Sequence, residues 1–148
     1  MPARDKLKAL RLVERISRHQ LESIGAELAG IRAEQAELDR KARALSAQAS
    51  EEAVESTLDT RPYLPAYLGS VDRQQQSWSR KSAALDREAA DIETRLLGAF
   101  RELKTRETVR DRAEQDVAAE AERVEVAMMD DAGRTLFLRN RALETGGK

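Results

Sequence analysis

A narrow stripe of mostly apolar positions recurs through the first third of the chain at alternating steps of three and four residues. The stripe consists of Leu21, Ile24, Leu28, Ile31, Gln35, Leu38, Ala42, Leu45 and Ala49. Such alternation is typical of the a and d positions of a heptad repeat, through which one helix packs on another. No proline lies between Asp5 and Leu58, so the pattern predicts a first helix over about residues 5–58. Upstream, the steps of three, four and four through Leu10, Val13, Ser17 and Leu21 predict a stutter in the repeat.

A second stripe follows with the same alternation. It consists of Leu68, Val71, Gln75, Trp78, Ser82, Leu85, Ala89, Ile92, Leu96, Ala99 and Leu103, and then of a shifted set, Val109, Ala113, Val117, Val124 and Met128. The pattern predicts a second helix over about residues 66–132, with Gly133 as a stop or hinge. The remainder, residues 133–148, is expected to be a short helix or a frayed tail.

The segment "DTRPYLPAYLGSVD", residues 59–72, separates the two stripes and holds Pro62 and Pro65. Proline lacks an amide hydrogen and disfavours helical geometry in the residue before it, so two prolines three residues apart predict the end of one helix and the start of the next. A seam this narrow is not stable alone. We therefore expect an all-α fold, a single long antiparallel two-helix coiled-coil hairpin with its tip at residues 59–65.

Charge supports the antiparallel register. A turn near residue 62 places the first turns of the first helix beside the region near residue 117, where opposite charges face one another. The basic set is Arg4, Lys6, Lys8 and Arg11, and the acidic set is Glu114, Asp116, Glu120 and Glu122. In this register residues past about 124 have no partner from the first helix. That overhang holds Val124, Val126, Met128, Met129, Leu136, Phe137 and Leu138, more apolar surface than a free end tolerates without a partner.

Composition narrows the function. Aromatic residues make up 3% and charged residues 36% of the chain, which suits long helices and not a rounded core. The 26 basic and 27 acidic side chains are interleaved and the net charge is -1, so nucleic-acid binding is not expected. The chain has no cysteine, which fits a reducing cytosol. We expect neither a secretory signal nor a membrane span.

Residues with catalytic chemistry are sparse. His19 is the only histidine and is interpreted as a solvated helix residue. The sequence has no glycine-rich phosphate loop, no Ser/His/Asp set and no metal-ligand spacing, so we expect no enzymatic activity, no metal and no cofactor. The carboxylate pairs Glu51 with Glu52 and Asp130 with Asp131 are expected to be solvated.

The aromatic residues around the turn have two interpretations. Leu64, Tyr67, Leu68 and Val71 lie at helical spacing and form one apolar face at the tip. This face either binds a partner together with Tyr63 and Trp78, since tyrosine and tryptophan favour interfaces, or closes the turn as a hydrophobic plug. Trp78, on the seam, is also interpreted as a core filler.

The chain resembles a known family in its order of segments. An unbroken first helix is followed by "YLPAYLGSV", by the glutamine-rich "DRQQQSWSRKSAALDREAADIE" and by "AFRELKTRETVRDRAEQD". This order is similar to that of the FliJ family of flagellar export proteins, and "MMDDAGRTLF" is similar to the acidic stretch near the end of that family's chains. The resemblance implies a cytoplasmic component at the inner-membrane type III export apparatus, an antiparallel coiled coil similar to the central stalk of rotary ATPases.

The resemblance also implies partners. The paired terminal end would enter the hexameric export ATPase, the tip would contact the cytoplasmic domain of the export gate, and the protein would escort export chaperones. By position, the gate-binding residues would be Tyr63, Leu64, Tyr67, Leu68, Val71 and Trp78, and the ATPase-facing residues Arg4, Lys8, Arg11, Val124, Met128 and Phe137. The two prolines at the turn and Gly98 within the second helix depart from the family pattern.

Two other functions remain open at this point. One is the equivalent stalk of a virulence-type injectisome, which has the same architecture and a similar composition. The other is a structural coiled-coil scaffold without an export role, built as a parallel or tetrameric bundle.

Overall fold

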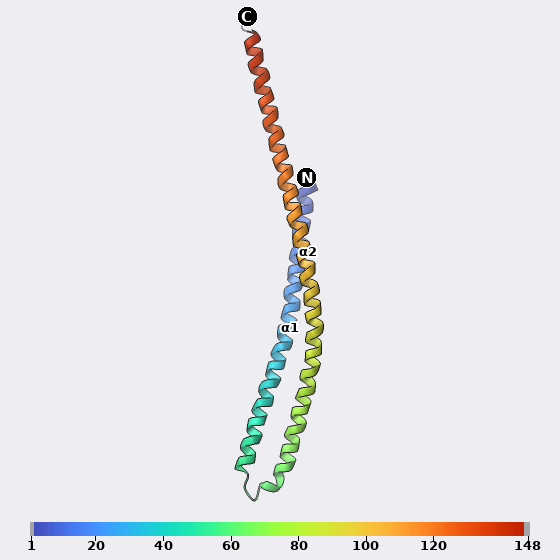
Figure 1. Cartoon of the computed structure of the whole chain (residues 1–148), viewed down its shortest axis with the longest axis vertical. Coiled ribbons are helices and arrows are strands. Elements are labelled where there is room, and N and C mark those ends of the chain that lie inside the picture. Colours follow the sequence, from blue (N-terminus) through green and yellow to red (C-terminus); the bar gives the residue numbers. More distant parts are fainter. Residues whose placement is uncertain (1, 147–148) are drawn as a thin grey trace. The chain divides into compact units, whose positions relative to one another are not determined.

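Two long helices joined by a short connection make up the chain. The computed structural model describes residues 2–146, with α1 at Pro2–Glu55, a 3-10 helix η1 at Arg61–Tyr63, and α2 at Leu64–Gly146 (Figure 1). Within this range no residue forms a strand. The predicted fold class, an all-α antiparallel two-helix coiled-coil hairpin, is confirmed.

The chain divides into two compact units, each built from a segment of α1 and a segment of α2. The hairpin unit is Arg18–Arg101, and the terminal unit is the described part of Met1–Ser17 with that of Glu102–Lys148. In each unit the two helix segments run antiparallel, as the ion pairs between them require.

The core of the hairpin unit is the predicted seam. Its buried apolar members are Leu38, Ala49, Val71, Leu85, Ala89 and Ile92. The other predicted seam positions between Leu21 and Ala99 are half-buried, except Leu68, which is 39% exposed. Two facing helices cover only one stripe of each other, so within residues 2–146 no large side chain is fully enclosed.

The turn differs from the prediction in where α1 ends. The helix ends at Glu55, three residues earlier than expected. The Thr57 amide donates to Oγ1 of Thr60 at 2.9 Å, and the Thr57 carbonyl accepts from the amides of Thr60 and Arg61 at 3.2 and 2.8 Å. Threonine side chains compete with helical hydrogen bonds in this way, so these contacts, and not the prolines, end α1.

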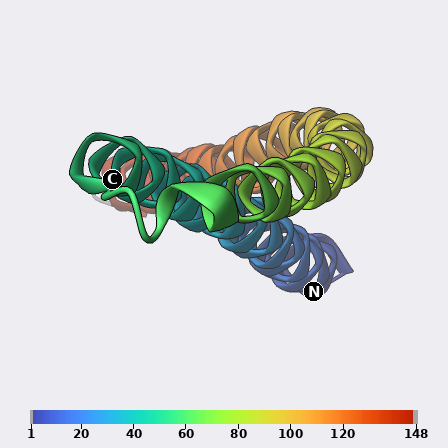
Figure 2. The same cartoon turned by 90° about the horizontal axis from the view of Figure 1, so that it is seen from below.

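The prolines instead begin the next elements. Pro62 lies within η1, and Pro65 lies in the first turn of α2, which starts at Leu64 and not at residue 66. Proline suits the first turn of a helix because the amide hydrogen it lacks has no partner there. Proline is also the first residue of α1, which begins at Pro2, upstream of the predicted start at Asp5. Figure 2 shows the connection from the end of α1 to the start of α2.

The terminal unit corrects one position of the predicted stutter, where Glu14 and not Val13 is the buried residue, and one of the predicted shifted set, while Ala113 and Val117 of that set lie on the seam as predicted. The buried residues of this unit are Leu7, Glu14, Ser17, Leu103 and Ala113, with Arg106 and Arg110 half-buried. With the half-buried Leu10 between Leu7 and Glu14, these positions continue the alternation of three and four in each helix. The seam therefore includes the charged residues Glu14, Arg106 and Arg110. Val109, expected on the seam, is 44% exposed. The buried positions keep the same spacing because the facing helix covers one side of each helix, whether the side chains there are apolar or charged.

The end of α2 is a further correction. The helix runs through Gly133 to Gly146, so the stop expected after Ala132 does not form, and most of the expected tail is helical. A glycine that ends a helix adopts a left-handed conformation, and no described glycine does so. One interior glycine costs only about 1 kcal/mol relative to alanine. Residues 147 and 148 of the expected tail lie outside the described residues.

Candidate functional site: two exposed apolar surfaces

Two glutamine side chains on the seam of the hairpin unit hold the register between its helices. In the hairpin unit, Gln35 Nε2 donates to the Ser82 carbonyl at 3.2 Å and to Asp86 Oδ1 at 2.6 Å. Gln75 Nε2 donates to Ser46 Oγ at 3.1 Å. A polar residue at a seam position specifies alignment, because a shifted register leaves it unsatisfied.

Arg32 adds a charged link across the hairpin unit. Its guanidinium donates to Glu93 Oε1 at 2.7 Å and to Asp86 Oδ1 at 3.2 Å. The hydrogen bond to Glu93, with that carboxylate's charge and the contact with Asp86, raises the pKa of Arg32. Arg95 and Glu27 form a third ion pair at 3.4 Å. These pairs are exposed, so they select the alignment of the helices more than they stabilise the fold.

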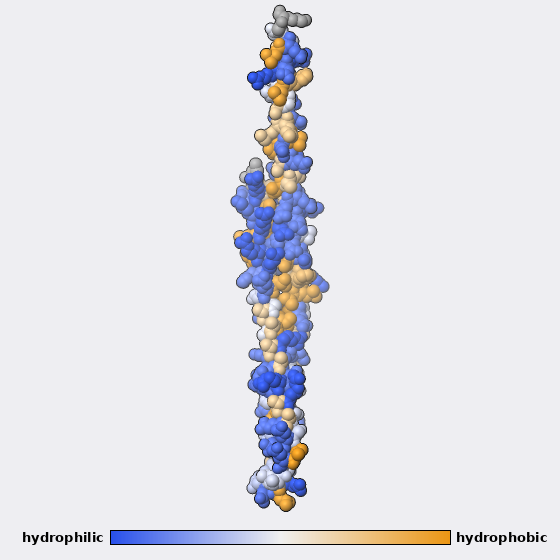
Figure 3. All heavy atoms as spheres, turned by 90° about the vertical axis from the view of Figure 1, so that its left-hand side faces the viewer, coloured by the Kyte–Doolittle hydropathy of each residue, from blue (hydrophilic) through white to orange (hydrophobic). Residues whose placement is uncertain are grey.

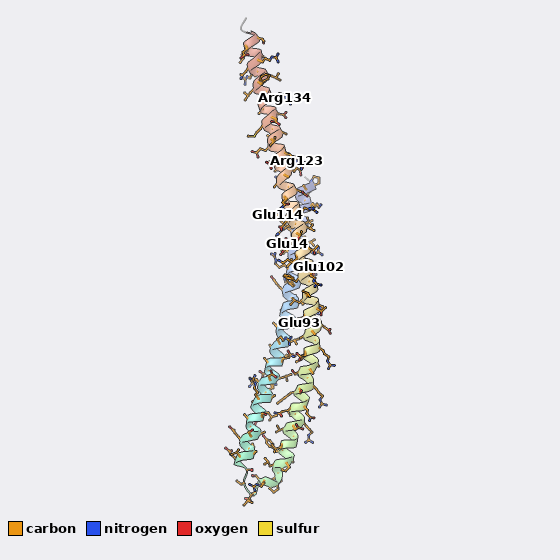
Figure 4. The ribbon with its side chains drawn as sticks, viewed as in Figure 1. Glu14, Glu93, Glu102, Glu114, Arg123 and Arg134 are labelled. Atoms are coloured by element: carbon orange, nitrogen blue, oxygen red, sulfur yellow. The ribbon has the colours of Figure 1, made fainter. Side chains whose placement is uncertain are left out.

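A charged pair lies on the seam of the terminal unit. Arg110 Nη1 donates to Glu14 Oε1 at 2.9 Å, and the Glu14 side chain is only 5% exposed. The same guanidinium donates to Asp111 Oδ1 at 2.8 Å, and this hydrogen bond, aided by the charges of Glu14, Asp111 and Glu114, raises the pKa of Arg110. Figure 4 labels Glu14 on α1 and Glu114 on α2.

One ion pair and two cavities lined by opposite charges confirm the predicted charge register in the terminal unit. Arg11 Nη2 donates to Glu114 Oε1 at 3.2 Å. Arg4 and Glu120 line one cavity between the helices. A neighbouring cavity is lined by Lys6 and Asp116. Arg4, Lys8 and Arg11, expected to face an ATPase, are all exposed.

Exposed apolar side chains gather around the turn of the hairpin unit. We call this set the tip surface; it consists of Val54, Leu58, Tyr63 and Leu68, exposed by 85%, 85%, 74% and 39%. Val54 and Leu58 were missed as candidates in the sequence. The available signal was that both are apolar and lie off the seam beside the turn.

The residues predicted at the tip do not all lie on this surface. Tyr63 and Leu68 are exposed, Leu64 and Tyr67 are half-buried, and Val71 is 8% exposed. The burial of Leu64, Tyr67 and Val71 fits the interpretation that these three residues close the turn as a hydrophobic plug. Trp78 is half-buried on the seam and lines a cavity with Leu38 and Ala42, the place that a core filler takes. A binding role for Trp78 stays a prediction.

A cavity of about 270 Å³ lies beside the turn. It is lined by Glu52, Glu55, Ser56, Thr57, Thr60, Tyr63, Leu64 and Tyr67. The hydroxyl of Tyr67 is buried and has no hydrogen-bond partner among residues 2–146. The tip thus combines apolar surface with two carboxylates and two tyrosines.

The second exposed apolar surface is the free part of α2. Every residue from 121 to 146 is exposed. We call its large apolar side chains the terminal surface; they are Val124, Val126, Met128, Met129, Leu136, Phe137, Leu138 and Leu143. Apolar atoms interleave with hydrophilic ones along this part of the helix in the upper part of Figure 3. Single exposed apolar residues are ordinary, but eight large ones within residues 124–143 are more than a free helix end needs, and such surfaces are typical of binding sites.

Within residues 2–146 no group of three or more His, Cys, Asp or Glu side chains could hold a metal ion. His19 is exposed on α1.

No described helix has an apolar stretch of the length and hydropathy that crossing a bilayer requires.

Comparisons with protein-family models, with curated proteins and with solved structures found no match to this chain. The family resemblance therefore rests on the sequence motifs alone.

Proposed function

We propose that this protein is an adaptor of the flagellar type III export apparatus, which binds the export gate through the tip surface and the hexameric export ATPase through the terminal surface. It would act in the cytoplasm at the inner-membrane apparatus and escort export chaperones. The observation that carries the proposal is that large apolar side chains are exposed both around the turn and along the free part of α2.

The tip surface supports a protein partner. Three of its side chains have at least 74% of their surface exposed, so a partner can cover them without disturbing the seam. Tyrosine is enriched among interface residues that contribute most of the binding energy. Glu52 and Glu55 flank the turn, so the surface suits a partner with apolar groups and basic groups beside them.

The terminal surface supports a second, different partner. Its methionines, Met128 and Met129, are 68% and 67% exposed. Methionine is flexible and polarisable, which suits a surface that packs against several subunits in slightly different ways. The hexameric ATPase of the proposal is such a partner.

The first test is the motility of a strain lacking the gene, scored in soft agar, with complementation by the intact chain. The proposal expects lost motility, few filaments and full rescue by the wild type. A second complementing variant carries Val54→Ser, Leu58→Ser and Tyr63→Ser, and its matched control carries Leu97→Ser, an off-seam residue that is 50% exposed in the same unit.

The outcomes separate the alternatives. Rescue by the control but not by the tip variant supports export-gate binding. Normal motility of the deletion strain contradicts a flagellar role, and secretion by an injectisome is then measured in the same strain. If both systems are unaffected, the export proposal is wrong and a structural scaffold remains.

A further inference from the structure

We propose that a cavity on the seam of the hairpin unit binds the guanidinium group of an arginine side chain on a partner protein. The cavity has a volume of about 340 Å³, and Trp78, Asp39 and Asp86 are among the residues that line it. It belongs to neither the tip surface nor the terminal surface, so the proposal goes beyond the adaptor role and does not depend on it. The inference rests on the charges that the two helices bring together here and on the tryptophan beside them.

Ion pairs between the helices show which side chains face each other along one side of the seam. Arg32 on α1 pairs with Glu93 on α2, with Nη2 and Oε1 2.7 Å apart. Figure 4 labels Glu93. In the terminal unit, Arg11 and Glu114 form an ion pair of 3.2 Å at the equivalent heptad positions. Because the helices run antiparallel, the equivalent positions one heptad from Arg32 and Glu93 toward the turn are residues 39 and 86.

Two aspartates occupy these positions, where the other two levels pair an arginine with a glutamate. Both aspartates line the cavity, and its lining includes no lysine or arginine. The Asp39 carboxylate forms no ion pair and accepts no hydrogen bond within residues 2–146. At Asp86 only Oδ1 accepts hydrogen bonds, from Gln35 Nε2 at 2.6 Å and from Arg32 Nη1 at 3.2 Å. Like charges at facing positions repel, so a cation between the two carboxylates is favoured.

Two arginines of the chain itself lie near the aspartates, but neither lines the cavity. Arg32 already donates to Glu93, to Asp86 and to Gln35 Oε1. Arg43 donates from Nε to the Asp39 carbonyl at 3.4 Å, and not to the carboxylate. The remaining carboxylate oxygens of the cavity are therefore available to a cation from another molecule.

Trp78 selects the kind of cation. Its half-buried indole forms part of the cavity wall, and tryptophan is the side chain that attracts a cation most strongly over its ring. A guanidinium is planar and carries several N–H donors, so it can stack on a ring while it donates to carboxylates. A lysine ammonium is a compact, strongly hydrated charge and does both less well.

The size of the cavity suits one side chain. Small-molecule sites span about 300–1,000 Å³, and this cavity lies at the lower end of that range. An arginine side chain presented by a partner protein is therefore the occupant that matches the cavity in charge, shape and size.

The test uses the full chain and three short peptides. Trp78 is the only tryptophan of the chain, so tryptophan fluorescence reports directly on the cavity. The probes are the tripeptide alanine–arginine–alanine with both ends blocked, the same peptide with lysine, and the same peptide with citrulline, an uncharged analogue of arginine. All titrations are made at one ionic strength. We expect saturable binding of the arginine peptide, binding of the lysine peptide at least about threefold weaker, and no binding of the citrulline peptide.

Two variants tie the binding to the cavity. Asp39→Asn should raise the dissociation constant of the arginine peptide about tenfold, because one hydrogen bond to a charged acceptor is lost. Trp78→Leu, followed by NMR titration of the amides that surround the cavity, should raise it at least about threefold. Asp130→Asn with Asp131→Asn removes two carboxylates outside the hairpin unit and is the matched control, which should bind as the wild type does. Circular dichroism checks that helix content is retained.

Several outcomes would overturn the proposal. They are a lack of saturable binding of the arginine peptide, equal binding of the lysine or the citrulline peptide, and wild-type affinity in Asp39→Asn. Binding that is seen only after Arg43→Gln would show that the chain's own arginine fills the cavity, and would overturn it too. Motility plays no part in these measurements, so this proposal and the proposed function fail separately.

Discussion

Replacing Val54, Leu58 and Tyr63 together by serine should remove partner binding at the tip surface while leaving folding almost unchanged. Their side chains are exposed by 85%, 85% and 74%. Full burial of a large apolar side chain stabilises by about 1.5–3 kcal/mol, and only the small covered part of each is lost here. The free energy of unfolding should therefore fall by about 1 kcal/mol or less for the triple variant.

The effect on binding should be far larger. A partner that covers these side chains gains most of their transfer free energy, so its dissociation constant should rise by about a hundredfold or more. The assay is isothermal titration calorimetry of the purified cytoplasmic domain of the export gate into wild type, triple variant and the Leu97→Ser control. Urea unfolding followed by circular dichroism gives the stability of the same samples.

Two results would refute the reasoning. A loss of more than about 2 kcal/mol in the free energy of unfolding would show that these side chains support the turn in spite of their exposure. Unchanged affinity in a stable triple variant would show that the tip surface does not contact the export gate.

Three further predictions concern the helices themselves. Leu38→Ala should lower the free energy of unfolding by about 2–3 kcal/mol, the low end for such a change. The cost is low because Leu38 borders an open cavity of about 340 Å³, so the substitution leaves no closed void. Urea unfolding followed by Trp78 fluorescence measures the change. Gly133→Ala should stabilise the free part of α2 by about 0.5–1 kcal/mol, because alanine favours the helix and its added Cβ meets no atom within 4 Å. Slower amide hydrogen exchange around residue 133 would support this prediction, and unchanged exchange would contradict it. The pKa of Glu37 is lowered, chiefly by hydrogen bonds that Arg40 donates. The stability that this pair contributes is therefore present above the ordinary glutamate pKa and is lost as the pH falls through the lowered value. Arg40→Gln should raise the pKa of Glu37 in a carboxyl NMR titration, and an unchanged titration would contradict the pairing.

The sequence predicted most of the fold because heptad spacing is a local property of the chain. Leu38, Leu85 and Ile92 are buried where the pattern placed them. The spacing failed where charged residues take seam positions, as at Glu14 and Arg110, because an apolar pattern cannot register a charged residue that is buried against a partner. It therefore placed Val13 and Val109 on the seam, one residue away from Glu14 and Arg110, which occupy it.

The candidate site was predictable in part for a related reason. The overhang was visible because charge aligned the two helices, and Val124 and Met128 are exposed as that alignment required. At the tip, Val71 lies on the predicted stripe and packs inward, whereas Val54 and Leu58 lie off it and face outward. The spacing separated these residues, but how much of each side chain stays exposed at the turn depends on the position of the facing helix.

By itself the sequence determined two helices, a turn between them and the face each helix presents over most of its length, because helix propensity and heptad spacing act between residues close in the chain. Only the tertiary structure decided where α1 ends, which side chains at the turn stay exposed, and which charged residues enter the seam. Those outcomes depend on contacts across the hairpin and at the turn, where a facing helix covers one stripe regardless of its composition, and a Thr57 to Thr60 hydrogen bond ends α1 before the prolines can.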